Sequence, residues 1–72
     1  MISENVRRIR KNKDLSQDKL AKLAGITLTT LVKIESGTND NPTIKTLKKI
    51  ADALEVTVND LLEEESKKPD SR

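Results

Sequence analysis

The sequence predicts an all-α protein, a compact bundle of five short helices formed by 72 residues. Apolar side chains recur at spacings of three and four residues, which places them on one face of a helix. A serine or threonine stands at the start of each periodic segment, where its hydroxyl can accept hydrogen bonds from the amides of a first turn. Two glycines follow such segments and can end them.

The first helix is expected over residues 3–13, with Ser3 as its cap and Val6 and Ile9 facing the core. Ile2 precedes the cap and can form a hydrophobic staple. Most of the basic side chains of this segment are expected to face solvent or to lie loosely near phosphate; they are Arg7, Arg8, Lys11 and Lys13.

Residues 15–37 predict two short helices joined by a turn of about three residues, which is near the lower limit for such a link. Ser16 can cap the first of these helices, and Gly25 can end it because a residue without Cβ adopts the left-handed conformation. Thr27 can cap the second helix, which runs to about Ser36. The stripe expected to be buried on the first helix is Leu20, Leu23 and Ala24.

Two further helices complete the predicted bundle. Thr43 is expected to cap a helix that runs to about Leu54, and Thr57 a short helix over residues 58–64. The core stripe expected on the longer helix is Ile44, Leu47, Ile50, Ala51 and Leu54. The domain is expected to span residues 1–64, and the polar residues 65–72 to form a disordered tail.

Composition excludes several classes of function. There is no cysteine and no histidine, which removes disulfides, thiolate zinc sites and most acid–base chemistry. No catalytic constellation stands out, so no enzyme, cofactor or metal is expected. Asn39, Asp40 and Asn41 resemble part of a calcium loop, but the later glutamate is missing. No apolar run approaches the roughly 20 residues of a membrane span, and the amino end lacks the apolar block of a signal peptide, so a cytoplasmic location is expected.

Charge is distributed unevenly along the chain. Residues 1–49 contain 11 Lys and Arg against 5 Asp and Glu, whereas residues 50–72 contain 3 against 7. Because the basic half contains the two helices of residues 15–37, a polyanion would be drawn to that side of the domain. The alternative is an ordinary solvated charged surface.

The central part of the chain resembles the helix-turn-helix core of the lambda-repressor-like (Cro and Xre) DNA-binding domains. The segments that carry this resemblance are LSQDKLAKLAG and ITLTTLVKIE, followed by Ser36 and Gly37. The resemblance covers residues 3–62, and its clearest marks are Gln17, Ala21, Gly25, Ile26, Lys33, Ile34, Glu35 and Gly37. It implies sequence-specific binding of double-stranded DNA by a transcriptional regulator, which is expected to be a repressor. Residues 27–36 would then form the recognition helix in the major groove.

On this second helix of the motif, Leu31 and Ile34 are expected to pack inward. The residues expected to read bases are Leu28, Thr29, Thr30 and Lys33. In the resembled family the positions of Leu28 and Val32 are often polar, so the sequence departs from the pattern there. An apolar side chain can contact a thymine methyl, whereas Lys33 can bind a guanine edge. Packing of Leu28 on the core remains open as the alternative.

The phosphate contacts implied by the resemblance lie near the helix ends. They are Ser16, Gln17, Thr27, Ser36, Thr38, Asn39 and Thr43. Gln17 stands in a first turn, where free amides and the positive end of the helix dipole attract a phosphate. The alternative for Gln17 is an ordinary surface position, and Asp40 would repel a phosphate near its loop.

The resemblance also implies an ion pair between Arg10 and Glu35. Glu35 falls on the packed side of its helix, close to Leu31, where an unpaired carboxylate would be costly. The alternative is a Glu35 side chain that reaches solvent past the end of the helix.

Domains of the resembled family usually bind a palindromic operator as homodimers. The candidate dimer residues are Val56, Val58, Leu61 and Leu62, with closure of the monomer core as the alternative. A second hypothesis is a protein-interaction module, such as the antitoxin of a toxin pair, in which the acidic C-terminal segment binds a basic partner and DNA binding is autoregulatory. The chain could also be a fragment of a longer repressor.

Overall fold

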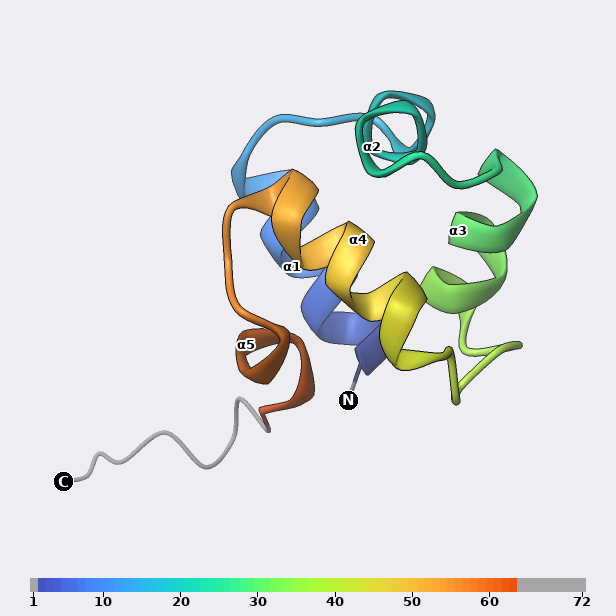
Figure 1. Ribbon diagram of the computed structural model, residues 1–72. Helices are drawn as coiled ribbons and strands as arrows, with labels where there is room; N and C mark the ends of the chain where they lie inside the picture. The colour runs from blue at the N-terminus through green and yellow to red at the C-terminus, as the bar shows by residue number, and fades with distance from the viewer. Residues whose placement is uncertain (1, 64–72) are drawn as a thin grey trace, which may run out of the picture.

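The computed structural model describes residues 2–63, and within that range the chain forms five α-helices and no strand (Figure 1). The helices are α1 (Ile2–Asn12), α2 (Gln17–Ala24), α3 (Leu28–Ser36), α4 (Ile44–Leu54) and α5 (Val58–Leu62). The all-α prediction is confirmed. The expected tail and the expected last residue of the fifth helix, Glu64, lie outside the described residues. Over residues 2–63 no helix combines the length and the apolar character that crossing a bilayer requires.

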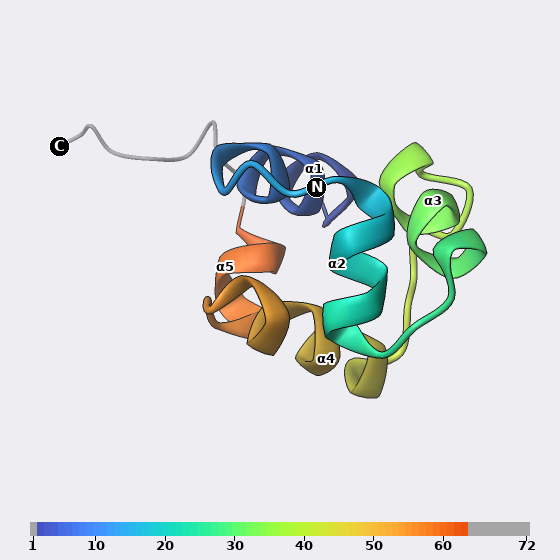
Figure 2. The same cartoon turned by 90° about the horizontal axis from the view of Figure 1, so that it is seen from above.

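The helices surround one apolar core. Helix α2 packs against α3 and α4, α1 packs against α3 and α5, and α4 packs against α5. Consequently α3 and α5 lie on opposite sides of the molecule in both views (Figures 1 and 2). The buried apolar residues are Val6, Leu20, Ala21, Ala24, Leu31, Ile34, Leu47, Ile50, Ala51, Leu54 and Leu61. Because α1 and α2 hold only the inner side of α3, the other side of this helix faces solvent.

Helix α1 begins earlier than the sequence predicts. Its first residue is Ile2, so Ser3 lies inside the first turn and the prediction of Ser3 as a cap is wrong. Ile2 packs against the core, and this contact favours a helix that includes it. Val6 is fully buried and Ile9 packs partly buried beside the core, as predicted.

Two residues predicted to be core are exposed. Leu23 is 55% exposed and Ile44 is 62% exposed. The buried stripe of α2 is centred on Leu20, Ala21 and Ala24, and at 3.6 residues per turn Leu23 points roughly a quarter of a turn away from that centre. Ile44 is the first residue of α4, and the start of this helix follows directly on the loop after α3 (Figure 1).

Helices α2 and α4 end in the same hydrogen-bonded cap, although only α2 has a glycine there. At the end of α2 the amide of Gly25 donates to Lys22 O (3.2 Å) and the amide of Ile26 donates to Ala21 O (3.0 Å). At the end of α4 the amides of Glu55 and Val56 donate to Asp52 O and Ala51 O at 3.1 and 3.0 Å. This paired pattern is a Schellman motif, which requires a left-handed residue. Glu55 takes that conformation with φ 61°.

Replacing Glu55 by glycine is therefore expected to stabilise the protein. The left-handed conformation costs a residue with a Cβ about 1–2 kcal/mol, and the greater freedom of glycine in the unfolded chain removes part of the gain. We expect Glu55→Gly to raise the free energy of unfolding in urea by about 1 kcal/mol. The control is Glu63→Gly, at an exposed position with φ −65°, where no gain is expected. Equal effects of the two substitutions would contradict the assignment of strain to Glu55.

The buried side chain of Asn5 connects α1 to the end of α5 by hydrogen bonds. It is 1% exposed, and its Nδ2 donates to Leu61 O at 2.8 Å and to Glu63 O at 2.5 Å. These bonds satisfy carbonyl groups that the end of a helix leaves without an intrahelical partner.

Leu61 itself is 0% exposed and belongs to the monomer core. The prediction of Leu61 as a dimer contact is therefore wrong, because no surface of this side chain is free to meet a second copy.

Candidate nucleic-acid interface

Two side-chain caps and one glycine define the geometry of α2 and α3. The hydroxyl of Ser16 accepts from the Lys19 amide, and the hydroxyl of Thr27 accepts from the Thr30 amide, each at 3.0 Å. Gly25 has φ 71°, which ends α2 in the left-handed conformation that the sequence predicts. The short link that results sets α3 at a steep angle to α2 (Figure 1).

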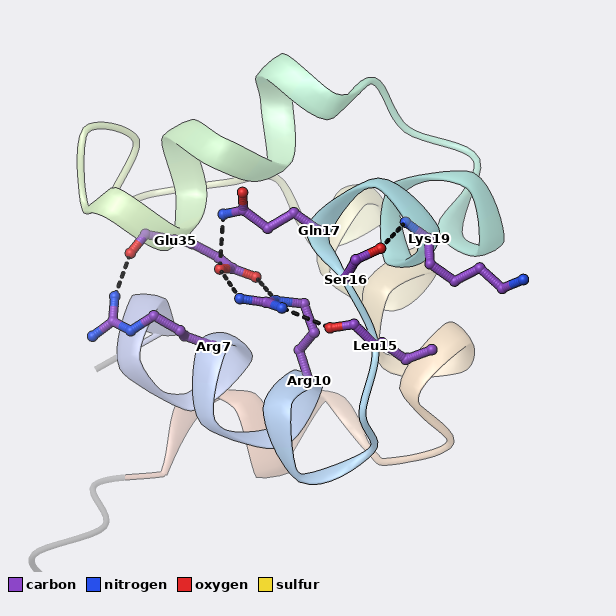
Figure 3. A network of polar contacts seen from close by, with 7 residues as sticks. All are labelled: Arg7, Arg10, Leu15, Ser16, Gln17, Lys19 and Glu35. Carbon is purple, nitrogen blue, oxygen red and sulfur yellow. Dashed lines mark hydrogen bonds and ion pairs between the residues drawn. The ribbon is translucent and has the colours of Figure 1, made fainter.

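Glu35, near the end of α3, is the centre of a polar network that reaches α1 and the start of α2 (Figure 3). Arg10 donates from Nε to Glu35 Oε2 at 2.7 Å and from Nη2 to Oε1 at 3.0 Å. Gln17 donates from Nε2 to the same Oε1 at 3.1 Å. Glu35 is only 3% exposed and Arg10 only 8%. The ion pair that the sequence predicts is present, and the alternative of a solvated Glu35 is wrong.

Arg7 belongs to the same network, and its predicted exposure to solvent is wrong. This residue is half-buried, and its Nη1 donates to the backbone O of Glu35 at 2.7 Å. The bond satisfies a carbonyl at the end of α3 and places a positive charge at the negative end of the helix dipole. Arg10 also donates from Nη1 to Leu15 O at 2.6 Å, which ties down the segment that leads into α2. The inner side and the end of α3 are thus held by α1.

The outer side of α3 carries the candidate base-reading residues. Thr29 and Lys33 are exposed, and so are Leu28 (43%) and Val32 (39%). Leu28 therefore does not pack into the core, which was the open alternative for this residue. Thr30 differs from the others because it is half-buried and its hydroxyl accepts from the Thr27 hydroxyl at 2.8 Å. The structure places Leu28, Thr29 and Lys33 on one exposed face and Thr30 at its flank.

The candidate phosphate contacts cluster at the ends of helices, and most of them already hold a local structural bond. Ser36 donates to Lys33 O at 3.2 Å and shares a hydrogen bond of 2.9 Å with Thr38. Thr43 caps α4 by accepting from the Thr46 amide at 3.1 Å. Among the seven candidates, Gln17 and Asn39 are half-buried, and Ser16, Thr27, Ser36, Thr38 and Thr43 are exposed. The bond from Gln17 to Glu35 brings the start of α2 beside the end of α3 (Figure 3).

The remaining candidate dimer residues lie far from α3. Val56 and Val58 are partly buried against the core, while Leu62 is 45% exposed. All three lie in or next to α5, on the side of the molecule opposite α3 (Figure 2). Leu62 is thus the member of this group with the largest free apolar surface. Over residues 2–63 no group of carboxylates is arranged to hold a metal ion.

The helix-turn-helix class of domains is defined by two helices joined by a short, tightly capped turn. The second helix packs on its inner side and is free on its outer side, as α3 is here. The helix-turn-helix family model of the Cro/C1 type matches residues 6–61. The chain belongs to this family.

Known proteins similar to the chain include a transcriptional regulator. The chain is 38% identical over 64 residues to the HTH-type transcriptional regulator SinR of Bacillus subtilis (strain 168). That match covers 89% of this chain and 58% of SinR, so the chain spans little more than half the length of this relative.

Two solved structures are also similar. One is a crystal structure of SinR, the master regulator for biofilm formation, in complex with DNA; it has a TM-score of 0.85 and 36% identity, and the match covers 88% of this chain and all of that chain. The other is a SinR–SinI protein complex, with a TM-score of 0.86 and 35% identity over 97% of this chain and 70% of that chain.

Proposed function

We propose that this chain binds double-stranded DNA in a sequence-specific manner and acts as a transcriptional regulator. Repression is the direction of regulation that we assign to it. The observation that supports this most directly is the division of α3 into two sides. Its inner side is fixed by Leu31, Ile34 and the buried Glu35, whereas Thr29 and Lys33 project into solvent. A helix with a fixed back and a free polar front suits the width of the major groove of B-DNA.

The proposed contacts divide into two kinds. Base reading is assigned to Thr29, Lys33 and Leu28 on the outer side of α3. Phosphate anchoring is assigned to the starts of α2 and α4, where backbone amides without intrahelical acceptors and the positive ends of the helix dipoles favour an anion. Gln17 can serve this second function while it remains bonded to Glu35, because a side-chain amide has two N–H donors.

The test is selection of bound duplexes from a randomised library, followed by titration of the selected duplex at several salt concentrations. We expect a defined consensus, and an affinity that falls more than about tenfold between about 50 and 200 mM salt, which corresponds to two or more neutralised phosphates. Failure to enrich any sequence, together with an affinity that does not respond to salt, would overturn the proposal.

The same selected sites report on assembly. A homodimer places two recognition helices about 34 Å apart, so the consensus would consist of two inverted half-sites one helical turn apart. The exposed Leu62, together with Val56 and Val58, is the surface that we assign to this contact. A single asymmetric half-site bound by a monomer in gel filtration would reject the homodimer.

A protein partner is the second candidate function, favoured by the similarity of this chain to the SinR of the SinR–SinI complex. In this form of the proposal, DNA binding is autoregulatory, as for the antitoxin of a toxin pair. We expect the intact chain to capture a defined protein, and this capture to be lost when Leu62 is replaced by aspartate. Capture that is unchanged in Leu62→Asp would argue against this surface.

In either form of the proposal, the site of action is the cytoplasm of a prokaryotic cell, and no catalytic activity is assigned.

A further inference from the structure

Leu28 and Val32 form a continuous apolar strip on the outer side of α3. They are separated by one helical turn, and Val32 lies on the side of the helix away from Ile34. Exposure of 43% for Leu28 and 39% for Val32 shows that neither side chain is used to fill the core. Around the helix axis Val32 lies about 60° from Thr29 and about 100° from Lys33, so the apolar strip forms one flank of the exposed face. This face enters the groove under the proposed function, on which this inference rests.

An apolar strip in the major groove selects a particular chemistry. Leucine and valine offer no hydrogen bond, and the apolar group that a base pair presents in this groove is the C5-methyl group of thymine. Against a guanine, adenine or cytosine edge, the apolar strip would remove water from polar atoms without replacing their hydrogen bonds, which is unfavourable. Contact with a methyl group instead removes apolar surface from water on both sides.

The spacing of the two side chains limits where the methyl groups lie. Residues four apart on a helix have Cβ atoms about 5–6 Å from each other, and successive base pairs rise by about 3.4 Å. Two methyl groups that meet Leu28 and Val32 together are thus one or two base pairs apart. The exposed ammonium of Lys33 on the same helix fits the negative potential of the same DNA.

We propose that Leu28 and Val32 determine specificity by reading two thymine methyl groups, one or two base pairs apart, in each half-site. Val32 is thus added to the residues proposed to read bases. The apolar side chains at these two positions, where the resembled family often has polar ones, would make the protein prefer sites with thymine.

The test replaces each thymine of the selected half-site, one at a time, by deoxyuridine, which removes the methyl group and leaves the hydrogen-bonding edge unchanged. Burial of one such carbon contributes about fourfold in affinity. We expect two positions at which deoxyuridine weakens binding by about that factor. At one of them the penalty should disappear in Val32→Ala, and at the other in Leu28→Ala.

The matched control is Leu23→Ala, which removes a leucine that is 55% exposed on α2 and is expected to keep both penalties. Deoxyuridine duplexes that bind as tightly as thymine duplexes would overturn this inference and leave the proposed function standing. Penalties that persist unchanged in Val32→Ala and Leu28→Ala would overturn it as well, because other residues would then contact the methyl groups. Absence of binding to any duplex would instead overturn the proposed function itself.

Discussion

Replacing Arg10 by methionine is expected to lower the free energy of unfolding by about 3–5 kcal/mol, as the loss of one partner of a buried ion pair does. The substitution keeps the length and apolar stem of the side chain but leaves the carboxylate of Glu35 without its bidentate partner. Glu35 is 3% exposed, so water cannot replace the lost bonds. Urea unfolding followed by circular dichroism measures the change.

The control for Arg10→Met is Lys11→Met, at the next position of the same helix, where the side chain is exposed and a change within about 0.5 kcal/mol is expected. Arg7 is unsuitable as a control because it donates to Glu35 O. The double variant Arg10→Met/Glu35→Met is expected to recover much of the loss, since replacing both partners of a buried pair by apolar residues is often neutral. Equal losses in Arg10→Met and Lys11→Met would contradict a stabilising role for the network.

Replacing Lys33 by alanine is expected to weaken binding to the selected duplex by about 1–3 kcal/mol, which corresponds to a lost base contact. Lys33 is exposed and has no part in the core, so the stability of the free protein should not change. Because the ammonium is assigned to a guanine edge, the loss should be confined to duplexes that keep this guanine. The preference at that single base pair should therefore relax in a repeated selection.

The control for Lys33→Ala is Lys48→Ala, which removes an exposed lysine of α4. Any effect of Lys48→Ala should be similar for every sequence, as expected of a distant charge. If Lys33→Ala weakened binding to all duplexes equally, Lys33 would have to be reassigned to a phosphate.

The parts of the fold that the sequence predicts correctly depend on local chemistry. Ser16, Thr27, Thr43 and Thr57 all cap helices, because a hydroxyl at such a position needs only the amide three residues later. Helical periodicity locates most of the core, but it does not show where a neighbouring helix stops. The core assignment of Ile44, the first residue of α4, is wrong for that reason. The core assignment of Leu23 is wrong because this side chain points away from the buried stripe of its own helix.

The polar network was only partly predictable. The pair of Arg10 and Glu35 followed from the family resemblance and from the cost of burying a lone carboxylate. The bonds from Arg7 and Gln17 to Glu35 join residues 28 and 18 positions apart, and nothing in the local pattern distinguishes these donors from surface residues. The left-handed Glu55 was missed because the sequence pattern for such caps is a glycine or an asparagine.

The proposed function requires the outer side of α3 to lie against DNA, and nuclear magnetic resonance titration of the isotope-labelled chain with the selected duplex tests this most directly. We expect the largest changes in amide and side-chain shifts at residues 28–33, with smaller ones at the first turns of α2 and α4. Binding that leaves residues 28–33 unperturbed, while shifts concentrate on α1 or α5, would contradict the proposed mode of binding.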